Sequence, residues 1–77
     1  NSIFIYPNPN EGVFSVEVLN NKEVFDIEVL NVIGQVVYHK ESNSGKVMMN
    51  IENYSKGVYF LRIEQAGQQA TKRIVLR

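Results

Sequence analysis

The residues best suited to acid–base or nucleophilic chemistry lie close together. His39 is the only histidine and Asp26 the only aspartate, and Ser42 and Ser44 follow His39 within a few positions. A hydrolase of the Ser–His–Asp kind needs a nucleophile held against the histidine in a site shielded from water. The serines fall in a predicted turn of a small domain, which offers little shelter. We therefore predict that His39 is a solvated strand residue, that Asp26 balances Lys40, and that the chain is not an enzyme.

The composition also argues against metal, cofactor and nucleic-acid sites. The chain has no cysteine, so no thiolate zinc site is possible, and a single aspartate with scattered glutamates does not make a calcium loop. Its glycines stand alone, without a phosphate-binding or dinucleotide-binding fingerprint. The formal net charge is zero, whereas a nucleic-acid-binding domain normally carries a clear basic excess. We predict no metal, no cofactor and no nucleic-acid partner.

The tyrosines offer a possible binding surface. Tyr6, Tyr38, Tyr54 and Tyr59 could together line a sugar-binding face, because flat rings stack on apolar sugar surfaces. Tryptophan, the usual strong platform, is absent. Tyr38 and Tyr59 also fall on strand faces predicted to be buried, and a tyrosine at an edge commonly buries its ring while its hydroxyl stays in water. Packing in the core or at its rim is the favoured interpretation.

The carboxyl-terminal residues are the only part of the chain with uneven charge. Lys72, Arg73 and Arg77 are not balanced by any acid, and they flank an apolar run from Ile74 to Leu76. Basic residues on a final strand can simply discourage edge-to-edge aggregation. Alternatively, an accessible terminal strand can be recognised by a partner through its backbone, its basic side chains, or both.

The elements that must position these residues are strands. Apolar and polar residues alternate with a period of two in residues 12–20, 24–32, 46–51 and 57–65, and no stretch has helical spacing. A short strand around Phe4 to Tyr6 and a last one in 70–77 complete the series, with turn signals roughly every 8–12 residues. We predict one domain, an antiparallel β-sandwich of immunoglobulin-like architecture with about seven strands and no helix. The expected core positions are Phe14, Val16, Val18, Phe25, Ile27, Val29, Val47, Met49, Ile51, Tyr59, Leu61 and Ile63.

The segment 28–38 is predicted to form a hairpin with two possible registers. Apolar faces match if Ile27 lies opposite Tyr38 and Val29 opposite Val36. A type I turn that starts at Asn31 and ends on Gly34 in the left-handed region favours a bulged register instead. Farther along, the spacing in residues 51–54 predicts a short irregular turn that plugs one end of the sandwich.

The opening motif, Tyr6 to Pro9, is predicted to be a structural boundary. Pro7 and Pro9 fix their own φ angles and favour extended geometry in the residues before them, which ends a short edge strand before Gly12 turns the chain. The Tyr6 ring is expected to lie against the rim. The chain begins with Asn1 rather than methionine, so we expect it to be part of a longer protein, with residues 1–3 as a linker remnant.

Taken in order, the punctuating motifs form a recognisable pattern. These motifs are YPNP (6–9), GVFSV (12–16), VLNVIGQVV (29–37), SKGVYFLRI (55–63) and TKRIVL (71–76). In this order and at these separations the chain resembles the type A C-terminal sorting domains of the type IX secretion system, the Por secretion tail family. The family's motif positions correspond to Tyr6, Pro7, Asn8, Pro9, Gly12, Phe14, Gly34, Gly57, Tyr59, Lys72 and Val75. Asn31 stands where the family often has aspartate, and Tyr54 where a leucine is usual.

The resemblance implies a recognition module without catalysis. Such domains form small β-sandwiches at the carboxyl end of cargo proteins in certain Gram-negative bacteria. The cargo reaches the periplasm by a signal peptide, and the domain then directs it through the outer-membrane translocon. A sortase-like protease commonly removes the domain, and many cargoes become attached to a surface lipopolysaccharide.

For this chain we predict translocon recognition at the terminal residues Lys72, Arg73, Ile74, Val75, Leu76 and Arg77. The expected partners are the translocon, the protease and an N-terminal cargo domain. We expect a monomer, with a strand-swapped dimer as the other possibility. The alternative function is an immunoglobulin-like binding or spacer module, with or without a carbohydrate contact, in an extracellular enzyme.

Overall fold

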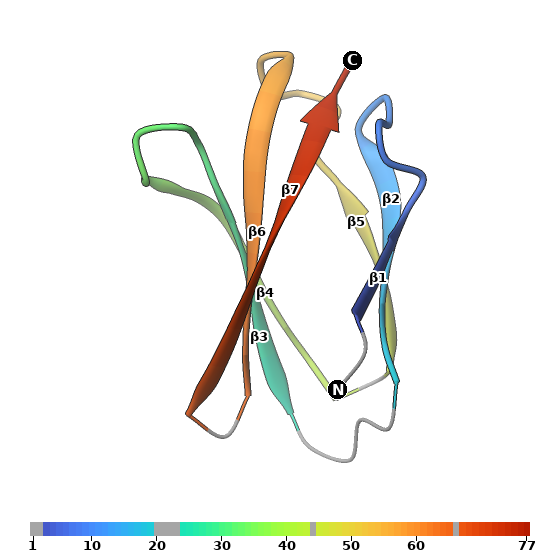
Figure 1. Cartoon of the computed structure of the whole chain (residues 1–77). Helices are drawn as coiled ribbons and strands as arrows, with labels where there is room; N and C mark the ends of the chain where they lie inside the picture. Colours follow the sequence, from blue (N-terminus) through green and yellow to red (C-terminus); the bar gives the residue numbers. More distant parts are fainter. Residues whose placement is uncertain (1–2, 20–23, 44, 66) are drawn as a thin grey trace.

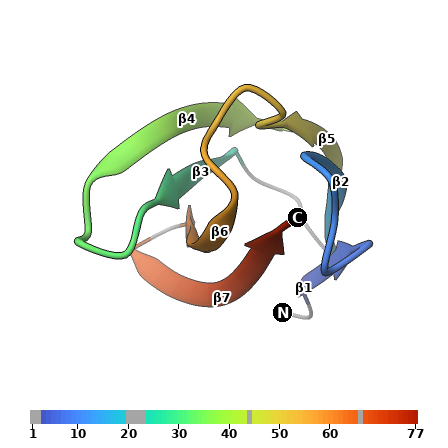
Figure 2. The same ribbon diagram turned by 90° about the horizontal axis from the view of Figure 1, so that it is seen from above.

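A computed structural model describes residues 3–19, 24–43, 45–65 and 67–77 of the chain. These residues form seven strands, which are β1 (Ile3–Tyr6), β2 (Val13–Val18), β3 (Phe25–Leu30), β4 (Val36–Ser42), β5 (Lys46–Asn50), β6 (Gly57–Gln65) and β7 (Gln68–Leu76). One sheet has the order β1–β2–β5 and the other β4–β3–β6–β7, and all neighbours within the sheets are antiparallel (Figures 1 and 2). The described residues contain no helix able to cross a membrane. The predicted seven-stranded antiparallel sandwich is confirmed.

The core lies between the two sheets and is built by the alternation that the sequence predicts. All of the expected core positions are buried, together with Ile74 and Leu76 of β7. Ser15 is the exception to the alternation, because it faces away from the core and is nevertheless buried. It lies in the central strand β2, paired with Tyr6 on one side and Met48 on the other, and its hydroxyl donates a hydrogen bond to the Met48 sulfur.

The β3–β4 hairpin has the bulged register. Val29 pairs with Tyr38 and Leu30 with Val36, which leaves Val37 as the extra residue. The register that places Val29 opposite Val36 is therefore wrong. The turn explains the difference, because Gly34 has a φ of +86° and its N–H donates to the Asn31 carbonyl at 3.0 Å. A type I turn closed by a left-handed glycine adds one residue to the returning strand.

The turn after β5 closes one end of the sandwich, as predicted. The Ile51 side chain is buried, and the Tyr54 N–H donates to the Ile51 carbonyl at 3.1 Å. The Tyr54 hydroxyl then donates to the carbonyl of Val37 in β4 at 2.8 Å. A half-buried ring with a bonded hydroxyl thus joins this turn to the opposite sheet.

The opening segment follows directly from β1. Residues 1–2 of the predicted linker remnant lie outside the described residues, whereas Ile3 is already the first residue of β1. The Tyr6–Pro7 and Asn8–Pro9 peptide bonds are both cis. Beyond them, Asn10 forms an isolated parallel bridge with Leu76 of β7. The first and last segments of the described chain therefore lie side by side.

Candidate functional site

Strand β7 forms one edge of the four-stranded sheet, with β6 as its only neighbour in that sheet. Its two faces differ strongly. The Ile74 and Leu76 side chains are buried in the core, whereas Arg73 is exposed and Val75 is half-buried. The terminal residues that we predicted to be recognised thus divide into a group that builds the core and a group that faces solvent.

The outer edge of β7 is covered over its carboxyl-terminal half by the opening motif. The Asn8 side-chain amide donates to the Arg73 carbonyl at 3.0 Å, and its oxygen accepts from the Val75 N–H at 3.1 Å. Next along the edge, the Asn10 N–H donates to the Val75 carbonyl at 3.0 Å and the Asn10 carbonyl accepts from the Arg77 N–H at 2.8 Å. We call Asn8 and Asn10 the asparagine clamp. Because of the clamp, backbone groups of residues 73–77 are already paired on this side.

The clamp is fixed in turn by a tight bend at Gly12. The Asn10 side chain is buried, and its oxygen accepts from the Gly12 N–H at 2.8 Å. Gly12 has a φ of +117°, and a Cβ at this position would lie 2.7 Å from the Cα of Glu52. The Gly12 carbonyl also accepts from the Ile51 N–H at 2.7 Å. Only glycine fits this position without displacing backbone.

Tyr6 lies at the rim, as predicted. The Tyr6 ring is partly exposed, with its hydroxyl donating to Glu17 at 3.1 Å and the Lys46 ammonium 5.6 Å from the ring centre. Its contacts therefore hold it against neighbouring strands.

The basic side chains of the terminal segment make no such contacts. Lys72, Arg73 and Arg77 are exposed, and within the described ranges none of their charged groups forms a hydrogen bond or an ion pair. Arg77 lines a shallow hollow of about 360 Å³ together with Glu11 and Glu52. Exposed, unpaired cations of this kind can contact an acidic partner without disturbing the fold.

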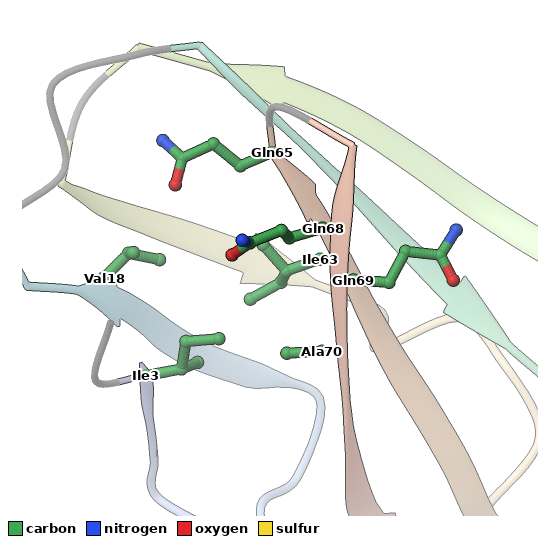
Figure 3. Close-up of a pocket in the computed structure, with 7 residues that line it drawn as sticks. All are labelled: Ile3, Val18, Ile63, Gln65, Gln68, Gln69 and Ala70. Atoms are coloured by element: carbon green, nitrogen blue, oxygen red, sulfur yellow. The ribbon is translucent and has the colours of Figure 1, made fainter.

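The amino-terminal half of β7 borders a small pocket. The pocket has a volume of about 130 Å³, and its lining includes Ile3 and Val18 from one sheet and Ile63 and Ala70 from the other. In Figure 3 the Gln65 and Gln68 side chains extend from the ends of β6 and β7 toward the side on which Val18 lies. The pocket offers an apolar floor and neutral amides, with no charged group among the lining residues.

Among the described residues, those considered for hydrolysis do not assemble a catalytic site. The His39 Nε2 lies 3.1 Å from an Asp26 carboxylate oxygen, and both side chains are partly exposed to water. Ser42 is three positions from His39 on the same strand, so their side chains point to opposite faces. Ser44 lies outside the described residues.

The expectation that Asp26 balances Lys40 is wrong. Strand alternation puts Asp26 on the same face as His39, whereas the Lys40 ammonium donates to the Met48 carbonyl at 3.3 Å. No group of three ligating side chains that could hold a metal occurs among the residues that the structure describes.

The tyrosines do not share an exposed face. Tyr59 is buried and its hydroxyl donates to the Ser55 carbonyl, while Tyr54 packs 6.5 Å from it with the rings tilted by 50°. Tyr38 is half-buried against the core. Tyr6 is the most exposed of the four, at 41%, and it lies in the other sheet.

Sequence reasoning missed Asn10, which is the most buried polar residue described. A signal for it exists in the sequence Asn10–Glu11–Gly12, because asparagine commonly bonds the backbone two residues on in an Asx-turn. The sequence gives no comparable sign that the partner of this turn is the last strand, more than 60 residues away.

Comparison with known proteins gives two matches. The family model described as "Secretion system C-terminal sorting domain" matches residues 4–77. Beta-agarase A of Zobellia galactanivorans is 35% identical to the chain over 72 residues. That match covers 94% of this chain and 13% of the agarase, so the chain spans only a small part of this curated relative.

Proposed function

Because the chain belongs to the family of secretion system C-terminal sorting domains, we propose that it directs an attached cargo protein through the translocon of the type IX secretion system. Domains of this family are sorting signals and not catalytic units. The match to a small part of a much longer agarase supports a module that is carried by a larger protein. The cargo lies on the amino-terminal side of the domain in the same precursor. The precursor enters the periplasm before it reaches the translocon.

The observation that carries this proposal is that the terminal segment has two kinds of side chain, buried apolar ones and exposed basic ones. Ile74 and Leu76 anchor the strand in the core, while Lys72, Arg73 and Arg77 present to solvent three cations that pair with no other described residue. Charged groups on an exposed rim steer and orient a partner while contributing little to folding. The translocon recognises these side chains. It does not recognise the outer backbone edge of residues 73–77, because that edge is hydrogen-bonded to the asparagine clamp.

Two further steps complete the proposed route. After export, a sortase-like protease removes the domain, and the cargo remains at the cell surface or is released.

The domain acts as a monomer. In this proposal the clamp and the pairing of β7 with β6 form within one chain.

A carbohydrate-contacting module is the weaker candidate. It needs several exposed rings that can stack on a sugar, but Tyr54 and Tyr59 are occupied by packing and hydrogen bonds inside the domain. No specific observation favours it.

The direct test fuses residues 1–77 to the carboxyl end of a periplasm-targeted fluorescent reporter in a type IX-competent bacterium. We expect the reporter to reach the cell surface or the medium. A fusion with Gly12→Ala, which is expected to destabilise the fold strongly, serves as the negative control, and a known sorting domain serves as the positive control. If the unmodified fusion stays in the periplasm while the positive control is exported, the proposed function is wrong.

A further inference from the structure

The tip of the β3–β4 hairpin presents two aliphatic side chains to solvent. Ile33 is 75% exposed and Val32 is 69% exposed, the largest values among the exposed large hydrophobic residues described, and Val36 beside them is 46% exposed. Figure 1 shows the hairpin projecting away from the body of the sandwich. Exposing a cluster of branched aliphatic side chains at a protruding point is unfavourable in water unless a partner covers it.

The tip is held rigidly by a network around Asn31. Its side-chain oxygen accepts from the Ile33 N–H at 3.1 Å and the Gln35 N–H at 2.9 Å, and its amide donates to the Gln35 side chain at 2.8 Å. The Asn31 N–H and carbonyl also bond Gln35 and Gly34. A surface that is already ordered loses little conformational entropy on binding. The network is therefore suited to presenting Val32 and Ile33 in one fixed arrangement.

The chemistry of the hairpin indicates what kind of partner it fits. Residues 29–38 include no charged residue, and the turn itself, 31–35, has no aromatic one. A segment that inserts into an anionic membrane surface normally combines apolar residues with Lys, Arg, Trp or Tyr. Two branched aliphatic side chains with a neutral amide rim match an apolar pocket on a protein instead.

The tip also lies at the end of the sandwich that holds the carboxyl terminus. Strands β3 and β7 both run antiparallel to β6, so their carboxyl ends point to the same end of the sheet, on either side of β6. The tip and the terminal residue accordingly lie at one end of the sandwich in Figure 1. A protein that contacts Arg77, the last residue of the basic terminal segment, approaches this end.

We propose that Val32 and Ile33 form an apolar anchor that inserts into a hydrophobic pocket of the protein that receives the terminal segment. This inference rests on the proposed function and adds a second contact to it. The basic side chains orient the partner, and the hairpin tip supplies apolar burial that the terminal segment lacks, because Ile74 and Leu76 are already in the core.

The test uses the reporter fusion with the double substitution Val32→Thr, Ile33→Thr, which keeps β-branched side chains and the turn. We expect export to fall about tenfold, because both apolar contacts are lost, with an unchanged thermal unfolding midpoint. Val24→Thr is the matched control, since Val24 is 52% exposed and precedes β3 at its other end. We expect this control to be exported normally.

Each other outcome overturns the inference in a distinct way. Equal export of the unmodified fusion and the double variant would contradict the apolar anchor but not the sorting function. If the unmodified fusion is not exported, both the anchor and the sorting function are contradicted. Tip-dependent sedimentation of the domain with phosphatidylethanolamine–phosphatidylglycerol vesicles would identify a membrane contact instead. A tip-dependent dimer in sedimentation velocity would identify a second copy as the partner.

Discussion

The asparagine clamp and the basic terminal segment lie against each other, but they use their polar groups in opposite ways. Asn8 and Asn10 bond β7 and the Gly12 bend through their side chains and backbone. The charged groups of Lys72, Arg73 and Arg77 bond nothing among the described residues. The clamp therefore contributes hydrogen bonds to the fold, whereas the basic side chains are displayed on its surface.

This contrast separates two effects that are easily confused in so small a domain. Removing a bonded, buried polar group costs stability, whereas removing an exposed, unpaired charge costs very little. Loss of export therefore has a different meaning in the two regions. Substitutions in the clamp test folding, and substitutions among the cations test recognition.

The largest effect is expected at the bend that fixes the clamp. Gly12→Ala combines an unfavourable φ with a Cβ placed 2.7 Å from the Glu52 Cα, and we expect it to lower the free energy of unfolding by about 4 kcal/mol. Urea denaturation of the isolated domain measures this. Gly34→Ala is the matched control, because Gly34 also has a positive φ but no atom within 4 Å of the added Cβ. Its expected cost is only about 1 kcal/mol. Equal costs at the two positions would contradict the close packing at Gly12.

The next effect concerns the buried half of the clamp. Asn10→Ala leaves the buried Gly12 N–H without its acceptor, and we expect a loss of about 2 kcal/mol of unfolding free energy. Asn10→Asp keeps an acceptor oxygen for this N–H and is expected to recover part of the loss. The thermal midpoint by circular dichroism reports both variants. A midpoint for Asn10→Ala equal to that of the unmodified domain would show that Asn10 does not support the bend.

A smaller effect is expected at the exposed half. Asn8→Ala removes two hydrogen bonds to β7 in a region open to water, so we expect a cost of about 1 kcal/mol. Amide hydrogen exchange by NMR is the sharper measurement, because the Val75 N–H loses its acceptor and should exchange faster. The Ile74 amide, on the other side of the strand, provides the internal control. Unchanged protection of Val75 would contradict the clamp.

The smallest effect on stability is expected among the cations. Lys72→Ala with Arg73→Ala removes two exposed charges that bond no residue in the described part of the chain, and we expect a change in unfolding free energy of less than about 0.5 kcal/mol. Differential scanning calorimetry at two salt concentrations checks this. A larger loss would show that these side chains stabilise the fold, as the clamp does.

The fold was predictable from the sequence because its signals are local. The alternation of Phe25, Ile27 and Val29, for example, specifies a strand with one buried face whatever its neighbours are. The hairpin register was less accessible. It depends on the backbone geometry at Gly34, and apolar matching alone favours a pairing that the turn does not permit.

The candidate site was predictable only in part, for a related physical reason. Uneven charge at Lys72, Arg73 and Arg77 is visible in the sequence, but burial of Ile74 and Leu76 beside them depends on the opposite sheet. The clamp was not predictable, because a side chain that bonds a distant strand edge leaves no periodic pattern. Asn8 looks like an ordinary turn residue until β7 is placed beside it.

The most direct test of the division between fold and recognition is the export of the reporter fusion with Lys72→Ala and Arg73→Ala, measured alongside Asn8→Ala. The reporter fraction outside the cell, compared with that of the unmodified fusion, is the quantity of interest. We predict that the double variant stays folded but is exported about tenfold less, as expected for lost charged contacts at an interface, whereas Asn8→Ala is exported as long as it stays folded. Export of the double variant at the unmodified level would contradict recognition through the basic side chains.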